Sequence, residues 1–123
     1  MGLNVHLKDN FCECCGRSDK VFDSGLTHNL TPMADEAKIY KIIWRPEELD
    51  ITKASQIIGP LKAGIQAMEA DPKYYISFNP DNGWGSYNDF LPWLKKYLAA
   101  CEKYPNAIIE VSRRAWHERY AEG

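Results

Sequence analysis

The chain has 123 residues, of which 45 % are hydrophobic and 26 % are charged, and its formal net charge is −2. This length suits one domain with one core, and the composition excludes a disordered or membrane-embedded chain. The near-neutral charge argues against a protein that wraps duplex nucleic acid, because such proteins need a basic face. We therefore expect a single domain over residues 1–123 whose partners are small molecules or proteins.

The first ten residues lack the apolar core of a signal peptide, and no later run of apolar residues reaches transmembrane length. We therefore expect a cytoplasmic protein with no membrane partner. In that compartment the four cysteines are expected to be reduced or bound to a metal rather than paired in disulfides.

Two strands are predicted near the N-terminus. The first rests on an alternation of apolar and polar residues, in which the apolar members are Leu3, Val5 and Leu7. Strand side chains alternate between two faces, so His6 is expected to face away from the core. The second strand is predicted over residues 20–28. One of its faces carries Phe22, Ser24, Leu26 and His28.

The turn between these strands carries a candidate metal site. Cys12 and Cys15 have the C-x-x-C spacing of a zinc knuckle, within a turn at residues 12–16. A structural zinc site needs four ligands, and no second C-x-x-C follows. The residues that remain to complete it are Cys14, Cys101, His6 and His28. The alternative is a hairpin turn with reduced cysteines and no metal. Zinc is the one cofactor that the sequence suggests.

The end of the second strand carries a group of compact polar side chains, Thr27, His28 and Asn29. A helix is expected to begin here, capped by Asn29 or Thr31. A histidine and an asparagine beside unpaired backbone amides could hold a phosphate, a carboxylate or the polar edge of a base. In the alternative interpretation, His28 is a partly buried structural histidine and Asn29 is only a cap.

Three main helical regions are predicted to follow. The first covers residues 31–44, because apolar residues recur there at helical spacing. The second carries an apolar stripe from Ala54 to Met68, and Gly59-Pro60 is expected to kink or divide it. The third runs from about Asp89 to Tyr104.

The loop before the third helix is a candidate binding loop. Asn82-Gly83 favours a positive φ, and Trp84 stands between two glycines, which lets another group approach its indole closely. Tyr87 follows in the same stretch. Loops that carry aromatic residues on a rigid scaffold are common places for binding. The alternative is that Trp84 folds back and plugs the helices.

A last strand is predicted over residues 107–112, which completes a sheet with the first two. The order of elements predicts an α+β fold, in which three main helices cover a small antiparallel or mixed three-stranded sheet. Residues 113–123 are cationic and aromatic. They are expected to form a frayed tail or, alternatively, to dock a partner.

Several motifs resemble those of small uncharacterised proteins encoded by bacteriophages and their hosts. They are Thr27-His28-Asn29-Leu30 with Met33-Ala34, Trp44-Arg45-Pro46-Glu47-Glu48, Asn79-Pro80-x-Asn82-Gly83-Trp84-Gly85-x-Tyr87, and Val111-Ser112-Arg113. Such relatives are expected to carry a C-P-x-C-G-like knuckle, to which this chain adds Cys14. The resemblance covers most of the chain and implies a small accessory factor in the host cytoplasm, for example an inhibitor of host defence, that binds a host protein or a nucleotide.

Three hypotheses about function follow. The first is a non-catalytic binding module that holds a small polar or nucleotide-like ligand, or a protein segment. Its pocket would lie between Thr27, His28 and Asn29, which we call the polar corner, and the loop that carries Trp84. The residues of that pocket are Thr27, His28, Asn29, Asn82, Trp84 and Tyr87. The second is a small enzyme with His28 as general base or metal ligand, although the sequence offers no obvious nucleophile and no common catalytic motif. The third is an interaction or inhibitor domain without a pocket.

Overall fold

The computed structural model describes residues 2–9, 19–79 and 85–114. Its strands are β1 (Gly2–Asp9), β2 (Asp19–Thr27) and β3 (Ile108–Arg114). Its α-helices are α1 (Thr31–Glu36), α2 (Tyr40–Trp44), α3 (Ile58–Ala70), α4 (Pro72–Ile76) and α5 (Tyr87–Lys103). Short 3-10 turns are η1 (His28–Leu30), η2 (Pro46–Leu49) and η3 (Ala54–Gln56).

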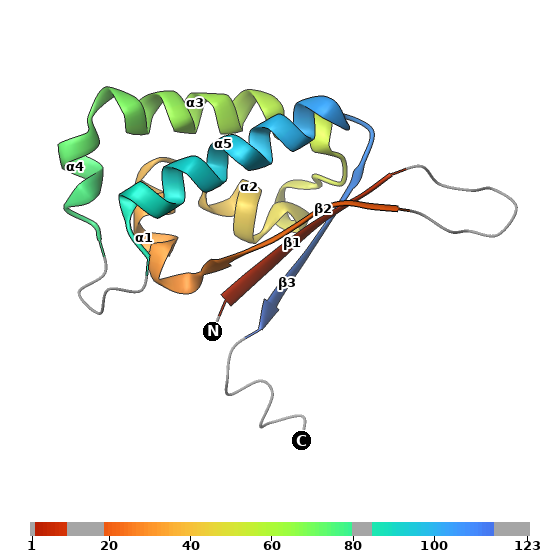
Figure 1. Ribbon diagram of the computed structural model, residues 1–123, viewed down its shortest axis with the longest axis horizontal. Helices are drawn as coiled ribbons and strands as arrows, with labels where there is room; N and C mark the ends of the chain where they lie inside the picture. The colour runs from red at the N-terminus through yellow and green to blue at the C-terminus, as the bar shows by residue number, and fades with distance from the viewer. Residues whose placement is uncertain (1, 10–18, 80–84, 115–123) are drawn as a thin grey trace, which may run out of the picture.

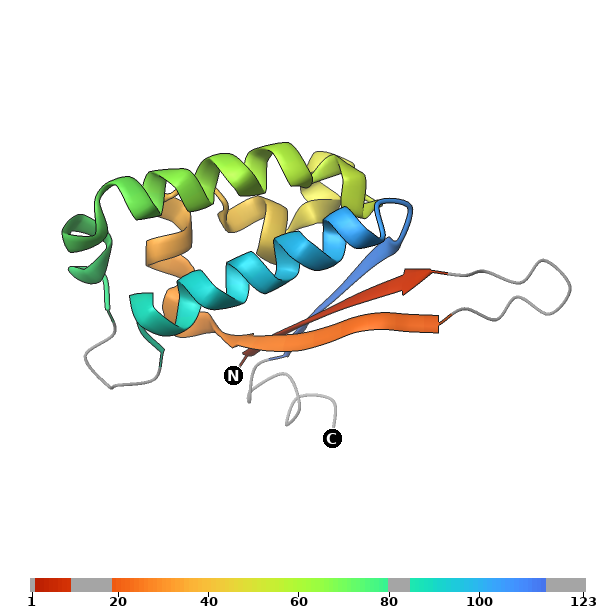
Figure 2. The ribbon, with the colours of Figure 1, turned by 45° about the horizontal axis from the view of Figure 1, so that its top comes forward.

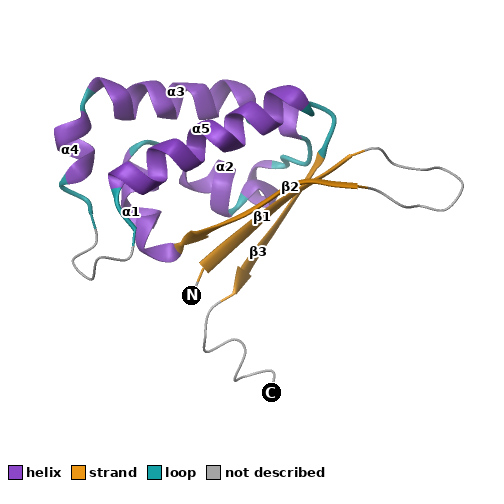
Figure 3. Cartoon of the chain, viewed as in Figure 1, coloured by secondary structure: helices purple, strands orange, loops and turns teal. Residues whose placement is uncertain are grey.

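The strands form an antiparallel sheet in the order β2-β1-β3, which confirms the predicted α+β fold (Figures 1 and 3). The central strand β1 pairs with both neighbours, and Val5 stands opposite Ser24 on β2 and Val111 on β3. The apolar positions of β1 are buried, as their alternation predicted. They are Leu3, Val5 and Leu7.

The helices gather on one side of the sheet, and α5 crosses it while α3 packs on α5 (Figure 2). Two side chains of β2 fasten α5 to the sheet. The indole N–H of Trp93 donates to Ser24 Oγ at 2.8 Å, and the ring of Phe22 stacks on that of Tyr97 with centroids 5.4 Å apart. Phe22 and Ser24 therefore contact helix α5, the arrangement expected if they share the core face of β2.

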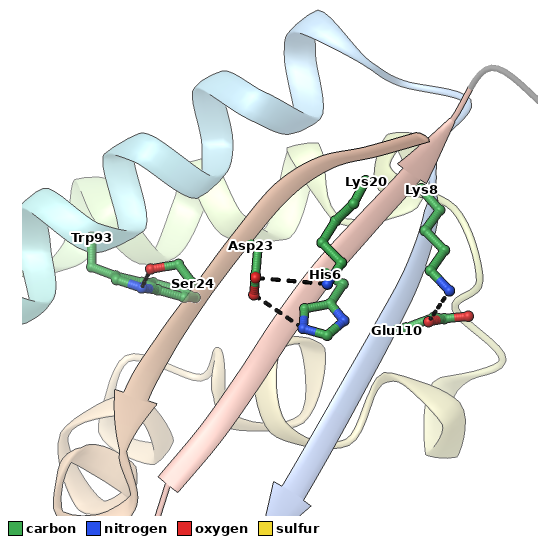
Figure 4. Close-up of polar contacts among 7 residues, drawn as sticks. All are labelled: His6, Lys8, Lys20, Asp23, Ser24, Trp93 and Glu110. Atoms are coloured by element: carbon green, nitrogen blue, oxygen red, sulfur yellow. Dashed lines mark hydrogen bonds and ion pairs between the residues drawn. The ribbon is translucent and has the colours of Figure 1, made fainter. Parts of the chain in front are cut away.

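The other face of the sheet is polar, and no helix in the described ranges covers it (Figures 1 and 2). Figure 4 shows its polar side chains paired across the strands: His6 Nε2 lies 3.0 Å from Asp23, and Lys8 lies 3.0 Å from Glu110. Lys20 also contacts Asp23, at 3.7 Å. His6 thus lies on the polar face, as predicted, with Asp23 as its partner.

The helix predicted over residues 31–44 is divided into α1 and α2, so this prediction was wrong in extent. The chain turns at Lys38, whose φ of 62° lies in the left-handed region and ends a helix. The turn brings Ile39 against Gly64 of α3, where a side chain on Gly64 would clash with Ile39 Cγ2. Tight packing of Ile39 on α3 thus favours a break that helical spacing alone does not reveal.

The boundaries of the later helices also differ from those predicted. The second region divides before Ile58 rather than at Gly59-Pro60, because Pro60 falls in the first turn of α3, where no intrahelical donor is needed. Helix α5 begins at Tyr87, two residues earlier than predicted, because Ser86 caps it by accepting from the Asp89 amide at 3.3 Å.

Two glycines of α3 provide a matched test of this packing. We expect Gly64→Ala to lower the free energy of unfolding by about 1–3 kcal/mol, because the added methyl group overpacks the contact with Ile39. A Cβ added at Gly59 has no neighbouring atom within 4 Å. Gly59→Ala should therefore leave the free energy of unfolding unchanged or raise it by up to about 1 kcal/mol through helix propensity. Urea denaturation of both variants measures this difference, and equal stability would contradict the close packing of α3 on Ile39.

Candidate functional site

The polar corner lies where strand β2 ends and the 3-10 turn η1 begins. Thr27 is the residue that caps this turn, since its Oγ1 accepts a hydrogen bond from the Asn29 amide at 3.3 Å. The expected caps, Asn29 and Thr31, were wrong: Leu30 precedes α1 and makes no side-chain cap. The reason is the added 3-10 turn, which moves the cap to the last residue of β2.

His28 is tied to the core through Trp44. The indole N–H of Trp44 donates to His28 Nδ1 at 3.0 Å, and Trp44 itself is only 1 % exposed. Because Nδ1 accepts this hydrogen bond, the neutral imidazole is assigned its proton on Nε2. The contact supports the structural interpretation of His28, and it occupies one of the two nitrogens through which a general base would act.

The corner contacts the segment that leads into α5. Gly85 has a φ of +95°, and a Cβ placed there would lie 2.7 Å from Thr27 Cγ2 and 3.2 Å from Leu30 Cγ. Only glycine combines this backbone angle with so close an approach. Two segments far apart in the sequence therefore meet, as Figure 1 shows at the ends of β2 and α5. Asn82 and Trp84 of the predicted pocket lie outside the described residues.

Tyr87 anchors α5 and does not present its ring to a ligand. It is 6 % exposed, its hydroxyl donates to the Met68 carbonyl at 2.9 Å, and its amide donates to Asn79 Oδ1 at 2.8 Å. The ligand-binding role predicted for Tyr87 requires an exposed ring, so the geometry favours a structural role instead. The contact with Asn79 closes the base of the loop.

Next to the corner lies an open hollow of about 290 Å³, lined by Thr31, Pro32, Asp35 and Tyr40. Tyr40 is fixed at both ends: its ring stacks on Trp44 with centroids 5.8 Å apart, and its hydroxyl accepts from Arg45 Nε at 3.0 Å. This hydrogen bond raises the pKa of Arg45. The sequence had assigned Tyr40 to an apolar helix stripe, and Asp35 carried no recognisable signal.

Asp35 is an exposed carboxylate at this hollow, and no cationic side chain of the described residues lies within ion-pair distance of it. Its neighbour Glu36 accepts a hydrogen bond from the Tyr74 hydroxyl, which raises the pKa of Tyr74. Arg45 donates a hydrogen bond to the Tyr40 hydroxyl, but its guanidinium group also contacts the Glu48 carboxylate, at 3.5 Å. The hollow therefore offers an unpaired negative charge beside an aromatic wall.

The predicted zinc ligands Cys12 and Cys15, and the alternative Cys14, lie outside the described residues. Within the described ranges, no three histidine, cysteine or carboxylate groups are placed to hold a metal ion. Cys101 is buried in the core, and this burial raises its pKa to about 12, so its thiolate is disfavoured.

His28 is also too remote to complete a knuckle in the hairpin turn. The nine residues of β2 separate it from the hairpin, a span of about 30 Å. The chain between Cys15 and Asp19 bridges at most about 14 Å. His28 is therefore excluded as a partner of the cysteine cluster, whereas the cysteine pattern itself stays a prediction.

Comparison of the chain with protein-family models, curated proteins and solved structures found no match. None of the helices in the described part of the chain combines the length and the apolar character that crossing a bilayer requires.

The contact between His28 and Trp44 yields a stability prediction. We expect His28→Ala to lower the free energy of unfolding by about 1–3 kcal/mol, because the buried indole N–H loses this acceptor. His28→Gln offers an amide oxygen as a replacement acceptor and should recover part of the loss. Chemical denaturation followed by tryptophan fluorescence compares the two variants with the parent chain. A fully stable His28→Ala variant would show that the hydrogen bond is dispensable.

Proposed function

We propose that the protein is a non-catalytic binding module that holds a segment of a partner protein at the end of the molecule where β2 meets α5. The observation that carries this proposal is the contact of Gly85 with Thr27 and Leu30, beside the hollow at Asp35 and Tyr40. Concave sites with aromatic walls and a few polar groups are typical binding sites. In this proposal Thr27, His28 and Asn29 form the rim, with Asn82 and Trp84 contributed by the loop.

The contacts of His28 favour binding over catalysis. A general base needs an accessible lone pair within reach of its target and a second group that orients it. At His28 the lone pair of Nδ1 is directed at the Trp44 indole, which is itself buried. A reaction that protonated Nδ1 would break this hydrogen bond and disturb the packing of Trp44. We therefore keep the enzyme hypothesis only as an outcome of the test.

The hollow favours a protein segment over a nucleotide. Its volume of about 290 Å³ is at the lower limit of the range for sites that enclose a drug-sized ligand, about 300–1,000 Å³. The Asp35 carboxylate would also repel a phosphate group, since like charges at close range disfavour each other. A single side chain of a partner fits this volume and charge better than a phosphorylated ligand does.

The phage-like motifs place this proposal in a biological setting. Small accessory proteins of phages act on host components, so the partner in this proposal is a protein of the host cytoplasm.

Amide chemical shifts of the isotope-labelled protein test the site. The probes are ATP, a cyclic dinucleotide, ADP-ribose, and capped pentapeptide amides Gly-Ser-X-Ser-Gly in which X is arginine, glutamate, leucine or tryptophan. We expect at least one peptide to shift amides of residues 27–35, 40 and 85–87 in a saturable way.

Two results would overturn this proposal. One is that no probe shifts these amides at millimolar concentration, and the other is that every shift maps elsewhere on the protein. Chemical conversion of a bound probe would instead support the enzyme hypothesis. A nucleotide that binds there unchanged would keep a binding module but replace the protein partner by a small ligand.

The cysteine turn carries a separate proposal, that Cys12 and Cys15 bind zinc, with Cys14 as an alternative ligand. Metal analysis of protein purified without an affinity tag is expected to show about one equivalent of zinc per chain. Cys12→Ser should remove it, whereas Cys101→Ser should not, because Cys101 lies in the core. Protein that is free of zinc after purification and after exposure to excess zinc would refute this proposal.

A further inference from the structure

We infer that the hollow beside α1 receives the guanidinium side chain of an arginine from the bound protein segment. This inference rests on the proposed function and specifies the partner's chemistry at that site. It depends on three properties of the hollow: the charge of Asp35, the ring of Tyr40 and the small volume that they enclose with Thr31 and Pro32.

The first property is an unsatisfied negative charge. Asp35 has no cationic partner in the described parts of the chain, in contrast to the carboxylates of the sheet face, which contact lysine or histidine. Its neighbour Glu36 accepts a hydrogen bond from Tyr74 and adds to the negative potential of this end of the molecule. A cationic group entering the hollow would therefore meet a carboxylate that has no ion-pair partner among the described residues.

The second property is a rigid aromatic wall. Stacking on Trp44 and the hydrogen bond from Arg45 fix both ends of the Tyr40 side chain, so little conformational entropy remains to be lost on binding. A guanidinium group stacks on aromatic faces and forms two parallel hydrogen bonds with a carboxylate. An ammonium group makes point contacts only, which is why arginine fits this pair of groups better than lysine.

The third property is the small volume of the hollow, about 290 Å³, which together with its charge selects against other ligands. Arg45 donates a hydrogen bond to the Tyr40 hydroxyl and also contacts Glu48, so its charge is already engaged. The anionic groups of nucleotides or acidic peptides would meet the Asp35 carboxylate, whose like charge repels them. Pro32 and the ring of Tyr40 leave apolar surface for the methylene stem of a long side chain.

Matched peptides test the inference. The arginine pentapeptide is compared with the same peptide carrying citrulline, which keeps the shape of arginine and removes its charge, and with the lysine and glutamate peptides. Dissociation constants come from the shifts of amides 31–35 and 40. We expect the arginine peptide to bind at least about threefold more tightly than the citrulline peptide, and its affinity to fall with added salt.

Protein variants complete the test. Asp35→Asn keeps the size of the side chain and should weaken the arginine peptide about three- to tenfold while leaving the citrulline peptide unchanged. Glu102→Gln is the matched control, since it removes a carboxylate near the opposite end of α5, where Lys62 pairs with it at 3.3 Å. The control should not alter peptide affinity.

The outcomes separate this inference from the function on which it rests. If arginine and citrulline peptides bind equally, or if Asp35→Asn has no effect, the inference is wrong while a binding module remains. If a nucleotide or the glutamate peptide binds most tightly, the inference is also wrong. If no probe binds at all, the proposed function fails together with it.

Discussion

The hydrogen bond from the Trp44 indole to His28 joins the parts of the molecule on which the candidate site depends. Trp44 ends α2, yet its ring also stacks on Tyr40 and meets Phe90 of α5 edge-on, with centroids 6.2 Å apart. One buried indole therefore fixes the end of β2, the wall of the hollow and the first turns of α5. His28 is constrained in turn, because moving its imidazole away would cost the buried Trp44 indole N–H this acceptor.

The sheet could be predicted from the sequence, whereas the helix boundaries could not. Alternation in β1 reports which face is buried, and that information is local. The break at Lys38 is not local: the apolar spacing continues through it, and lysine is not a residue that normally marks a left-handed turn. It depends on the approach of Ile39 to Gly64, some 25 residues away in the sequence.

In the candidate site, too, the sequence predicted the features that depend on local residues and missed those that depend on long-range packing. The sequence identified Thr27, His28 and Asn29 as a polar corner, and the contact with Gly85 brings the loop's end to it. It could not show that His28 faces Trp44 or that Tyr87 is buried, because both depend on packing between distant elements. Asp35 and Tyr40 were missed for a related reason: a carboxylate and an aromatic ring on a helix acquire meaning only when the neighbouring turn places them together.

The loop that carries Trp84 is held at its base by groups outside it. Asn79 accepts from the Tyr87 amide, and Gly85 rests against Thr27, so the two residues that flank positions 80–84 are each held by contacts of the described chain. The entropy cost of closing this loop is therefore partly offset by the contacts of its two flanking residues, Asn79 and Gly85.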